Sequence, residues 1–264
     1  MPLGLGAGVY RMDRSYTDED GDGIPDSDER SVTFQHLLER TFGDDQVGGL
    51  DPRRADLLLD VRYVGDVTVS YQSRTHLTGL FRRHGIHIQW LQYPYRYELD
   101  RFEREYGYTV EDILWSPRSF YHNEIDPRLK DVALQVLVVP NTTDGQGKLR
   151  NDWGGLRNGA VAGMSFGNRA VVTAQGTAEQ ETKLLLHEIA HLALCHDDDP
   201  TNTGVMGTVN GNRDADLLPP EWVRLRDNLD NVRDTTEVDV IPRRCLWEEH
   251  LVVPASGHLS NRLS

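Results

Sequence analysis

Lysine is scarce in this chain: Lys130, Lys148 and Lys183 are the only three in 264 residues, and the formal net charge is −14. So negative a surface repels phosphate backbones and anionic headgroups, which argues against nucleic acid or a membrane surface as a partner. No apolar run reaches the roughly 18 residues that a membrane-spanning helix needs. The first 16 residues lack a basic segment followed by a long apolar one, so no secretion signal is expected, and the cellular location stays open.

Cysteine is also scarce, with Cys195 and Cys245 as the two in the chain. Two thiols are too few for a disulfide scaffold; a single disulfide between them is the alternative, but we expect them to be unpaired and partly buried. The sequence contains no internal repeat, no low-complexity tract and no phosphate-binding glycine loop between a strand and a helix. The length suits one large domain or two small ones, and a monomer is the default expectation.

The first distinctive stretch is DEDGDGIPDSDE, residues 18–29, which matches the calcium-loop pattern D-x-D-x-D-G-x5-E. Calcium takes about six to eight oxygen ligands, and alternating aspartates closed by a glutamate supply them on a flexible loop. The stretch resembles the single loops of dockerins and thrombospondin type 3 repeats, which implies a structural Ca²⁺ ion and not a sensor. A solvated acidic linker is the alternative. The expected calcium ligands are Asp18, Asp20, Asp22, the carbonyl of Ile24, Asp26 directly or through water, and both oxygens of Glu29.

Apolar periodicity predicts alternating helices and strands. A helix over residues 31–43, capped by Ser31 and ended by Gly43, precedes a strand at 55–64, a helix over about 70–84 and a strand at 85–93. A strand, helix and strand of this length predict a parallel pair. The nearly all-apolar segment 131–139 is expected at the centre of the sheet.

The remaining segments give weaker patterns. Residues 94–130 are expected to be helix and loop, and residues 140–159 a long loop rich in turn residues. Residues 160–174 predict a hairpin or an edge strand, with Gly167 and Asn168 at the turn.

A mostly buried helix follows Thr177, a predicted N-cap with Gln180 as its capping-box partner. It carries His187, Glu188 and His191. Imidazoles at positions i and i+4 lie about 40° apart on one helix face, so both can reach one zinc ion through bonds of about 2 Å. Glu188 projects beside them, where it can contact a water without binding the metal. Two half-buried histidines and an ion-paired glutamate are the alternative, because the bare H-E-x-x-H motif also arises by chance.

The longer stretch HEIAHLALCHDDDPTNTGVMG, residues 187–207, resembles the active site of the metzincin clan of zinc peptidases. Members carry H-E-x-x-H-x-x-G-x-x-H, or a final Asp in snapalysin-like members, followed by a methionine turn. Met206 lies 19 residues after His187, as in matrixin-like members. The resemblance covers roughly residues 50–233, closely at 187–207 and in outline elsewhere.

That resemblance implies an α/β fold of the zincin-like α+β type. A twisted mixed sheet would place an edge strand over the active-site helix, and a small C-terminal subdomain would follow that helix. Met206 would pack beneath the metal ligands without binding the ion. With the acidic loop, it predicts an N-terminal arm at 1–30 and a catalytic domain at 31–264, divided into subdomains 31–196 and 197–264.

Two positions depart from the clan pattern. Leu194 stands where the clan has glycine, and His196 falls one residue before the position of the third ligand, which Asp197 occupies. In an unbroken helix, His196 and Asp197 lie about 140° and 240° from His191, so the helix must end near residues 193–195 for either to bind.

The third ligand therefore has three candidates. We favour His196 because imidazole is a common zinc ligand, and Asp197 is the second candidate. Glu221 opens a predicted helix at 219–234 and would be a remote ligand of the gluzincin type. The methionine turn argues against that arrangement.

Together these residues predict a zinc endopeptidase that acts on a protein or peptide substrate. Zinc held by His187, His191 and His196 lowers the pKa of water toward about 7, and Glu188 acts as the general base. The substrate is expected to lie extended along the edge strand within 160–174. The alternatives are a non-catalytic binding module of the same fold, stabilised by calcium, and a zinc hydrolase acting on something other than protein.

Overall fold

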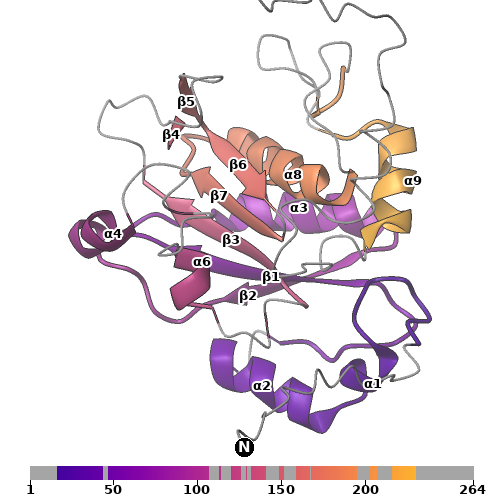
Figure 1. Ribbon diagram of the computed structural model, residues 1–264. Helices are drawn as coiled ribbons and strands as arrows, with labels where there is room; N and C mark the ends of the chain where they lie inside the picture. Colours follow the sequence, from indigo (N-terminus) through magenta and orange to yellow (C-terminus); the bar gives the residue numbers. More distant parts are fainter. Residues whose placement is uncertain are drawn as a thin grey trace, which may run out of the picture.

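A mixed five-stranded sheet forms the centre of this α/β protein, with strand order β2-β1-β3-β7-β6 (Figure 1). The computed structural model describes residues 17–43, 47–106, 120–125, 132–140, 149–151, 159–166, 168–194, 203–206 and 216–229, together with Ile113 and Leu129. The expected fold class is confirmed, including an edge strand beside the helix that carries His187.

Four of the five strands run parallel. They are β1 (Asp56–Tyr63), β2 (His87–Gln92), β3 (Leu134–Val139) and β7 (Arg169–Thr173). The last strand, β6 (Gly163–Phe166), pairs antiparallel with β7 and ends the sheet. Every residue of β1 and β3 is buried, which explains the nearly continuous apolar sequence of β3, while β1 also buries Asp56, Asp60 and Arg62. The predicted parallel pair, the central position of β3 and the β6–β7 hairpin are therefore confirmed.

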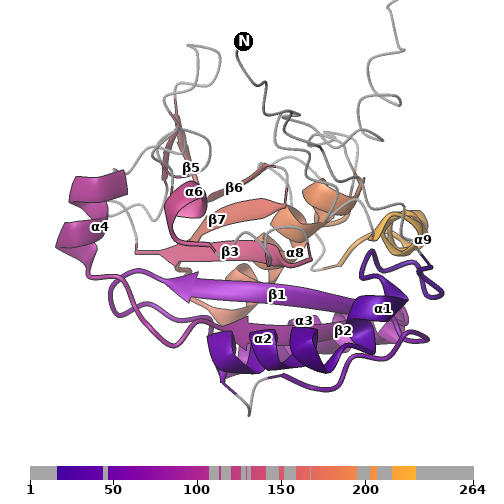
Figure 2. The ribbon, with the colours of Figure 1, turned by 60° about the horizontal axis from the view of Figure 1, so that its bottom comes forward.

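Helices cover both faces of the sheet (Figures 1 and 2). One face packs against α3 (Tyr71–Arg83) and α8 (Ala178–Leu194), and α9 (Pro219–Asp227) lies against α8. The other face packs against α2 (Val32–Phe42), α4 (Leu99–Tyr106) and α6 (Phe120–Asn123). Because side chains alternate along a strand, Leu57 and Leu59 of β1 join the first layer and Leu58 the second.

The predicted helix ends agree with the caps. Ser31 Oγ accepts the Phe34 N–H at 3.2 Å, and Gly43 ends α2 with a φ of 103°. Ser70 caps α3 in the same way, accepting the Ser73 N–H at 3.1 Å. No helix in the described ranges is both long and apolar enough to cross a bilayer.

Three local predictions were incomplete. The loop expected at 140–159 contains β4 (Leu149–Asn151), and β5 (Gly159–Val161) begins at its end; the two pair antiparallel. Strands of three residues are too short for a periodic pattern, which is why the sequence did not predict them. The acidic stretch also contains a short helix, α1 (Asp26–Glu29), and α9 is assigned to a shorter range than the predicted 219–234.

Candidate metal centre

Helix α8 carries the central residues of the site and lies against the edge strand β6 and against α3. Thr177 caps it as predicted, because its Oγ1 accepts the Gln180 N–H at 3.2 Å. The Gln180 side chain adds a second contact, because its Oε1 accepts a hydrogen bond from the Thr177 hydroxyl at 3.2 Å. Leu185, Leu186 and Ile189 are buried in the core, so the helix is fixed to the sheet on either side of His187.

The imidazoles of His187 and His191 face one another as the i and i+4 spacing predicts. Their Nε2 atoms lie 3.0 Å apart, and the ring planes cross at 80°. In a tetrahedral zinc site with bonds of about 2.0–2.1 Å, two ligand nitrogens lie about 3.3 Å apart. The pair is therefore close to the spacing that one shared zinc ion requires.

A backbone carbonyl orients the first of these rings. His187 is 8% exposed, and its Nδ1 lies 2.9 Å from the carbonyl oxygen of Val205. Because a carbonyl oxygen only accepts, the Nδ1 carries the proton and the Nε2 is the atom left for a metal. A backbone acceptor on the far ring nitrogen is a common arrangement for metal-binding histidines.

The segment that supplies this carbonyl is the predicted methionine turn. The Val205 N–H donates to the Asp216 carbonyl at 2.9 Å, which ties the turn to the chain before α9. Val205 and Met206 are fully buried in the core cluster that includes Ile189 of α8. Met206 thus belongs to the core on which the metal helix rests.

Glu188 is held against the edge strand. It is 4% exposed, and its Oε2 is hydrogen-bonded to the Ser165 hydroxyl, which also lies 2.9 Å from the Glu188 carbonyl oxygen. A Cβ placed at Gly163 would come within 2.7 Å of Glu188 Oε1, so glycine at this position lets the carboxylate approach the strand. Sequence reasoning did not single out Gly163 or Ser165, although residues two apart on a strand face the same side.

Two of the three candidates for a third zinc ligand lie outside the described residues. Cys195, His196 and Asp197 lie outside them, as does Cys245. Within the described ranges, no further histidine, cysteine or carboxylate joins His187 and His191 in a group whose ligand atoms lie within 4.8 Å of one another. Glu221 is instead the cap of α9, where its Oε2 accepts the Leu218 N–H at 2.7 Å.

The two imidazoles, with a buried carboxylate beside them, fit zinc in their donor chemistry. Neutral histidine nitrogens suit this metal, and Glu188 follows His187 directly on the same helix.

The acidic stretch at 18–29 is compact and lies far from α8 in the sequence. Ligand oxygens of Asp18, Asp20 and Asp22 lie within 4.8 Å of one another, and Gly23 makes the sharp turn with a φ of 84°. Asp22 also belongs to a second group of three buried carboxylates, with Glu29 and Asp56.

Two features of this region were not expected from the sequence. Asp26 turns away from both groups: its Oδ1 accepts the Glu19 N–H at 2.9 Å and its Oδ2 pairs with Arg30 at 3.2 Å. Asp56, at the start of β1, was not singled out because it lies 34 residues from Asp22 and no sequence pattern connects the two positions.

Comparisons with known proteins give a remote likeness. No protein-family model matches the chain, and no curated protein does. Among solved structures, the chain is similar to archaemetzincin from Methanopyrus kandleri. The two share 13% identity over 66% of this chain and 96% of the other, with a TM-score of 0.39. This likeness is coarse, so the function proposed below rests on the residues of the metal centre.

Proposed function

We propose that this protein is a zinc-dependent peptidase whose metal is held by His187, His191 and a third ligand, His196. The observation that supports it best is the 3.0 Å separation of the two Nε2 atoms, with the Val205 carbonyl on the other ring nitrogen of His187. If the two rings did not share an ion, the same 3.0 Å contact would be a hydrogen bond between them, and the folded protein would bind no zinc there.

The protein's own residues supply the proton transfers. When bound, zinc would supply Lewis acidity toward the attacking water and the scissile carbonyl. The Glu188 carboxylate takes the proton from that water and later delivers it to the leaving amine. The Ser165 hydroxyl and the close backbone at Gly163 hold this carboxylate in place, so it needs little rearrangement before the proton transfer.

The edge strand beside Glu188 gives the substrate its orientation. β6 is the last strand of the sheet in the described part of the chain and pairs with β7 through one of its edges. An extended peptide that adds to the other edge would form backbone hydrogen bonds and run past the Glu188 carboxylate. We therefore propose a protein or peptide as the substrate.

The test is the Glu188→Gln variant of the full chain, measured for bound zinc and for cleavage of a peptide library. The amide keeps the shape of the side chain but cannot accept the proton. Cleavage should fall by about 100-fold or more while zinc stays near one ion per chain. Glu179→Gln is the matched control, because this glutamate lies on the same helix and pairs with Lys183 at 2.8 Å on the surface.

Other outcomes would favour the alternative functions. A folded wild-type protein without zinc would support a non-catalytic binding module. Zinc at one ion per chain without cleavage of any library peptide would support a hydrolase that acts on another class of substrate. Undiminished cleavage by the Glu188→Gln variant would refute the role of Glu188.

A further inference from the structure

The side chain of Glu29 is buried without a hydrogen-bond partner. It is 7% exposed, and neither of its carboxylate oxygens accepts a hydrogen bond from the described part of the chain. Its oxygens instead lie in one group with those of Asp22 and Asp56, within 4.8 Å. A buried carboxylate that faces two others without a donor is strongly unfavourable unless something positive lies between them.

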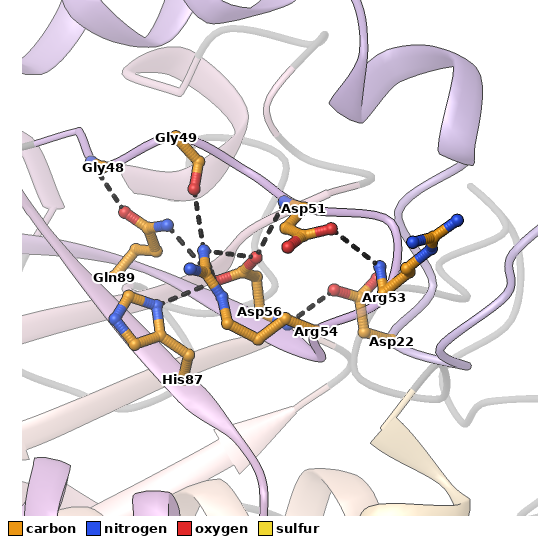
Figure 3. A network of polar contacts seen from close by, with 9 residues as sticks. All are labelled: Asp22, Gly48, Gly49, Asp51, Arg53, Arg54, Asp56, His87 and Gln89. Carbon is orange, nitrogen blue, oxygen red and sulfur yellow. Dashed lines mark hydrogen bonds and ion pairs between the residues drawn. The ribbon is translucent and has the colours of Figure 1, made fainter.

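Asp56 is the member of this carboxylate group that lies on the sheet. It is fully buried at the start of β1, where its carboxylate accepts from Arg54 at 2.9 Å and contacts His87 Nδ1 at 2.8 Å (Figure 3). Its backbone N–H donates to Asp22 Oδ2 at 2.7 Å. The acidic loop and the first strand are therefore joined at the point where their carboxylates meet.

The neighbouring loop residue Asp20 also has a buried carboxylate oxygen, its Oδ2, without a hydrogen-bond partner within the described residues. In this part of the chain, Glu29 and Asp20 thus each have a buried carboxylate oxygen without a hydrogen-bond partner beside other acidic side chains, an arrangement that a cation between them would stabilise.

We propose that one Ca²⁺ ion binds between the acidic loop and the start of β1, with ligands from Asp18, Asp20, Asp22 and Glu29 and with Asp56 as the ligand from outside the loop. The donors are all hard oxygens, which favours calcium over zinc. Asp22 belongs to both carboxylate groups, so the two groups adjoin at its side chain. Asp26 takes no part, because it belongs to neither carboxylate group.

A calcium ion at this site would join three parts of the fold. Ile24 of the loop is fully buried against the α2 layer and Leu58 of β1. Arg226 of α9 donates to the Asp20 carbonyl at 2.7 Å, and α9 lies against the metal helix α8. Calcium binding should therefore stabilise the native state of the whole domain by mass action.

The experiment uses the full chain, freed of metals and then supplied with one equivalent of zinc. Calorimetric titration with CaCl₂ should give one calcium ion per chain, with a Kd on the order of 10⁻⁶ to 10⁻⁴ M. The melting temperature should rise with calcium concentration. Neither measurement depends on peptide cleavage, so the calcium site and the proposed peptidase can fail separately.

Glu29→Gln is the decisive variant because its two effects have opposite signs. Removing one of the crowded charges should raise the melting temperature of the calcium-free protein, yet abolish the rise that calcium produces. Asp28→Asn and Asp51→Asn make similar charge changes nearby but outside both carboxylate groups, and should keep wild-type calcium affinity.

Asp56→Asn tests the ligand from the sheet, with circular dichroism to check folding. It should weaken calcium binding at least about tenfold, whereas Asp26→Asn should leave the affinity unchanged. Absence of calcium binding to the folded wild type, or a calcium-dependent rise in melting temperature that survives Glu29→Gln, would overturn the site. If a folded Asp56→Asn protein bound calcium with wild-type affinity, Asp56 would not be a ligand and the calcium site would not reach β1.

Discussion

Gly163 on the edge strand and Glu188 on the metal helix are in direct contact. A Cβ at Gly163 would lie 2.7 Å from Glu188 Oε1 and 3.1 Å from its Cδ. Any larger residue at this position must displace the carboxylate that we assign as the general base. The position of the proton acceptor is therefore set by the sheet as well as by its own helix.

Gly163→Ala should lower kcat for peptide cleavage by on the order of 10- to 100-fold, because the added methyl group moves the Glu188 carboxylate. Bound zinc should stay at the wild-type level, since the methyl group is added beside the Glu188 carboxylate and not beside the His187 and His191 rings. Gly79→Ala is the control, as a Cβ there meets nothing within 4 Å. Steady-state kinetics and metal analysis of both variants check this, and an unchanged kcat for Gly163→Ala would contradict it.

Ser165→Ala removes the hydroxyl that is hydrogen-bonded to Glu188. We expect kcat to fall about tenfold, with KM and zinc content unchanged, because the carboxylate loses the hydrogen bond that orients it. The double variant with Gly163→Ala should be less damaging than the product of the two single effects, since both act on one side chain. Independent, multiplicative effects would show that Ser165 acts on something other than Glu188.

The sequence predicted the elements whose pattern is local. The i and i+4 histidines, the cap at Thr177 and the apolar strand β3 each follow from spacing along the chain. Gly163, Ser165 and Asp56 did not, because their roles come from contacts with residues 25, 23 and 34 positions away. A glycine or serine in a strand looks the same in the sequence whether or not a helix carboxylate lies against it.

The third zinc ligand can be identified by three matched variants. His196→Ala should lower zinc affinity by about 100-fold or more, because a tetrahedral protein site with one open position needs three protein ligands. Asp197→Asn and Glu221→Gln should retain zinc, and glutamine at position 221 can still cap α9. Competition with a chromogenic zinc chelator measures each affinity. Loss of zinc from Asp197→Asn alone, or from Glu221→Gln alone, would transfer the assignment to that residue.

On the other face of the sheet, Asp60 and Arg62 form a buried ion pair. Their side chains are 0% and 2% exposed, and Arg62 Nη2 lies 3.0 Å from Asp60 Oδ2. The guanidinium also donates to the Glu124 carbonyl at 2.8 Å and lies over the Tyr93 ring. Removing the carboxylate would leave a buried positive charge without its counterion.

Asp60→Ala should therefore lower the free energy of unfolding by about 3–5 kcal/mol, measured by urea denaturation. The double variant Asp60→Leu with Arg62→Met should recover most of that loss, because an apolar pair of similar volume leaves no unpaired charge. Glu105→Gln breaks the surface pair with Arg101 and should have a far smaller effect, since water solvates both groups. If the double variant were as unstable as Asp60→Ala, packing around these side chains, and not the buried charge, would account for the loss.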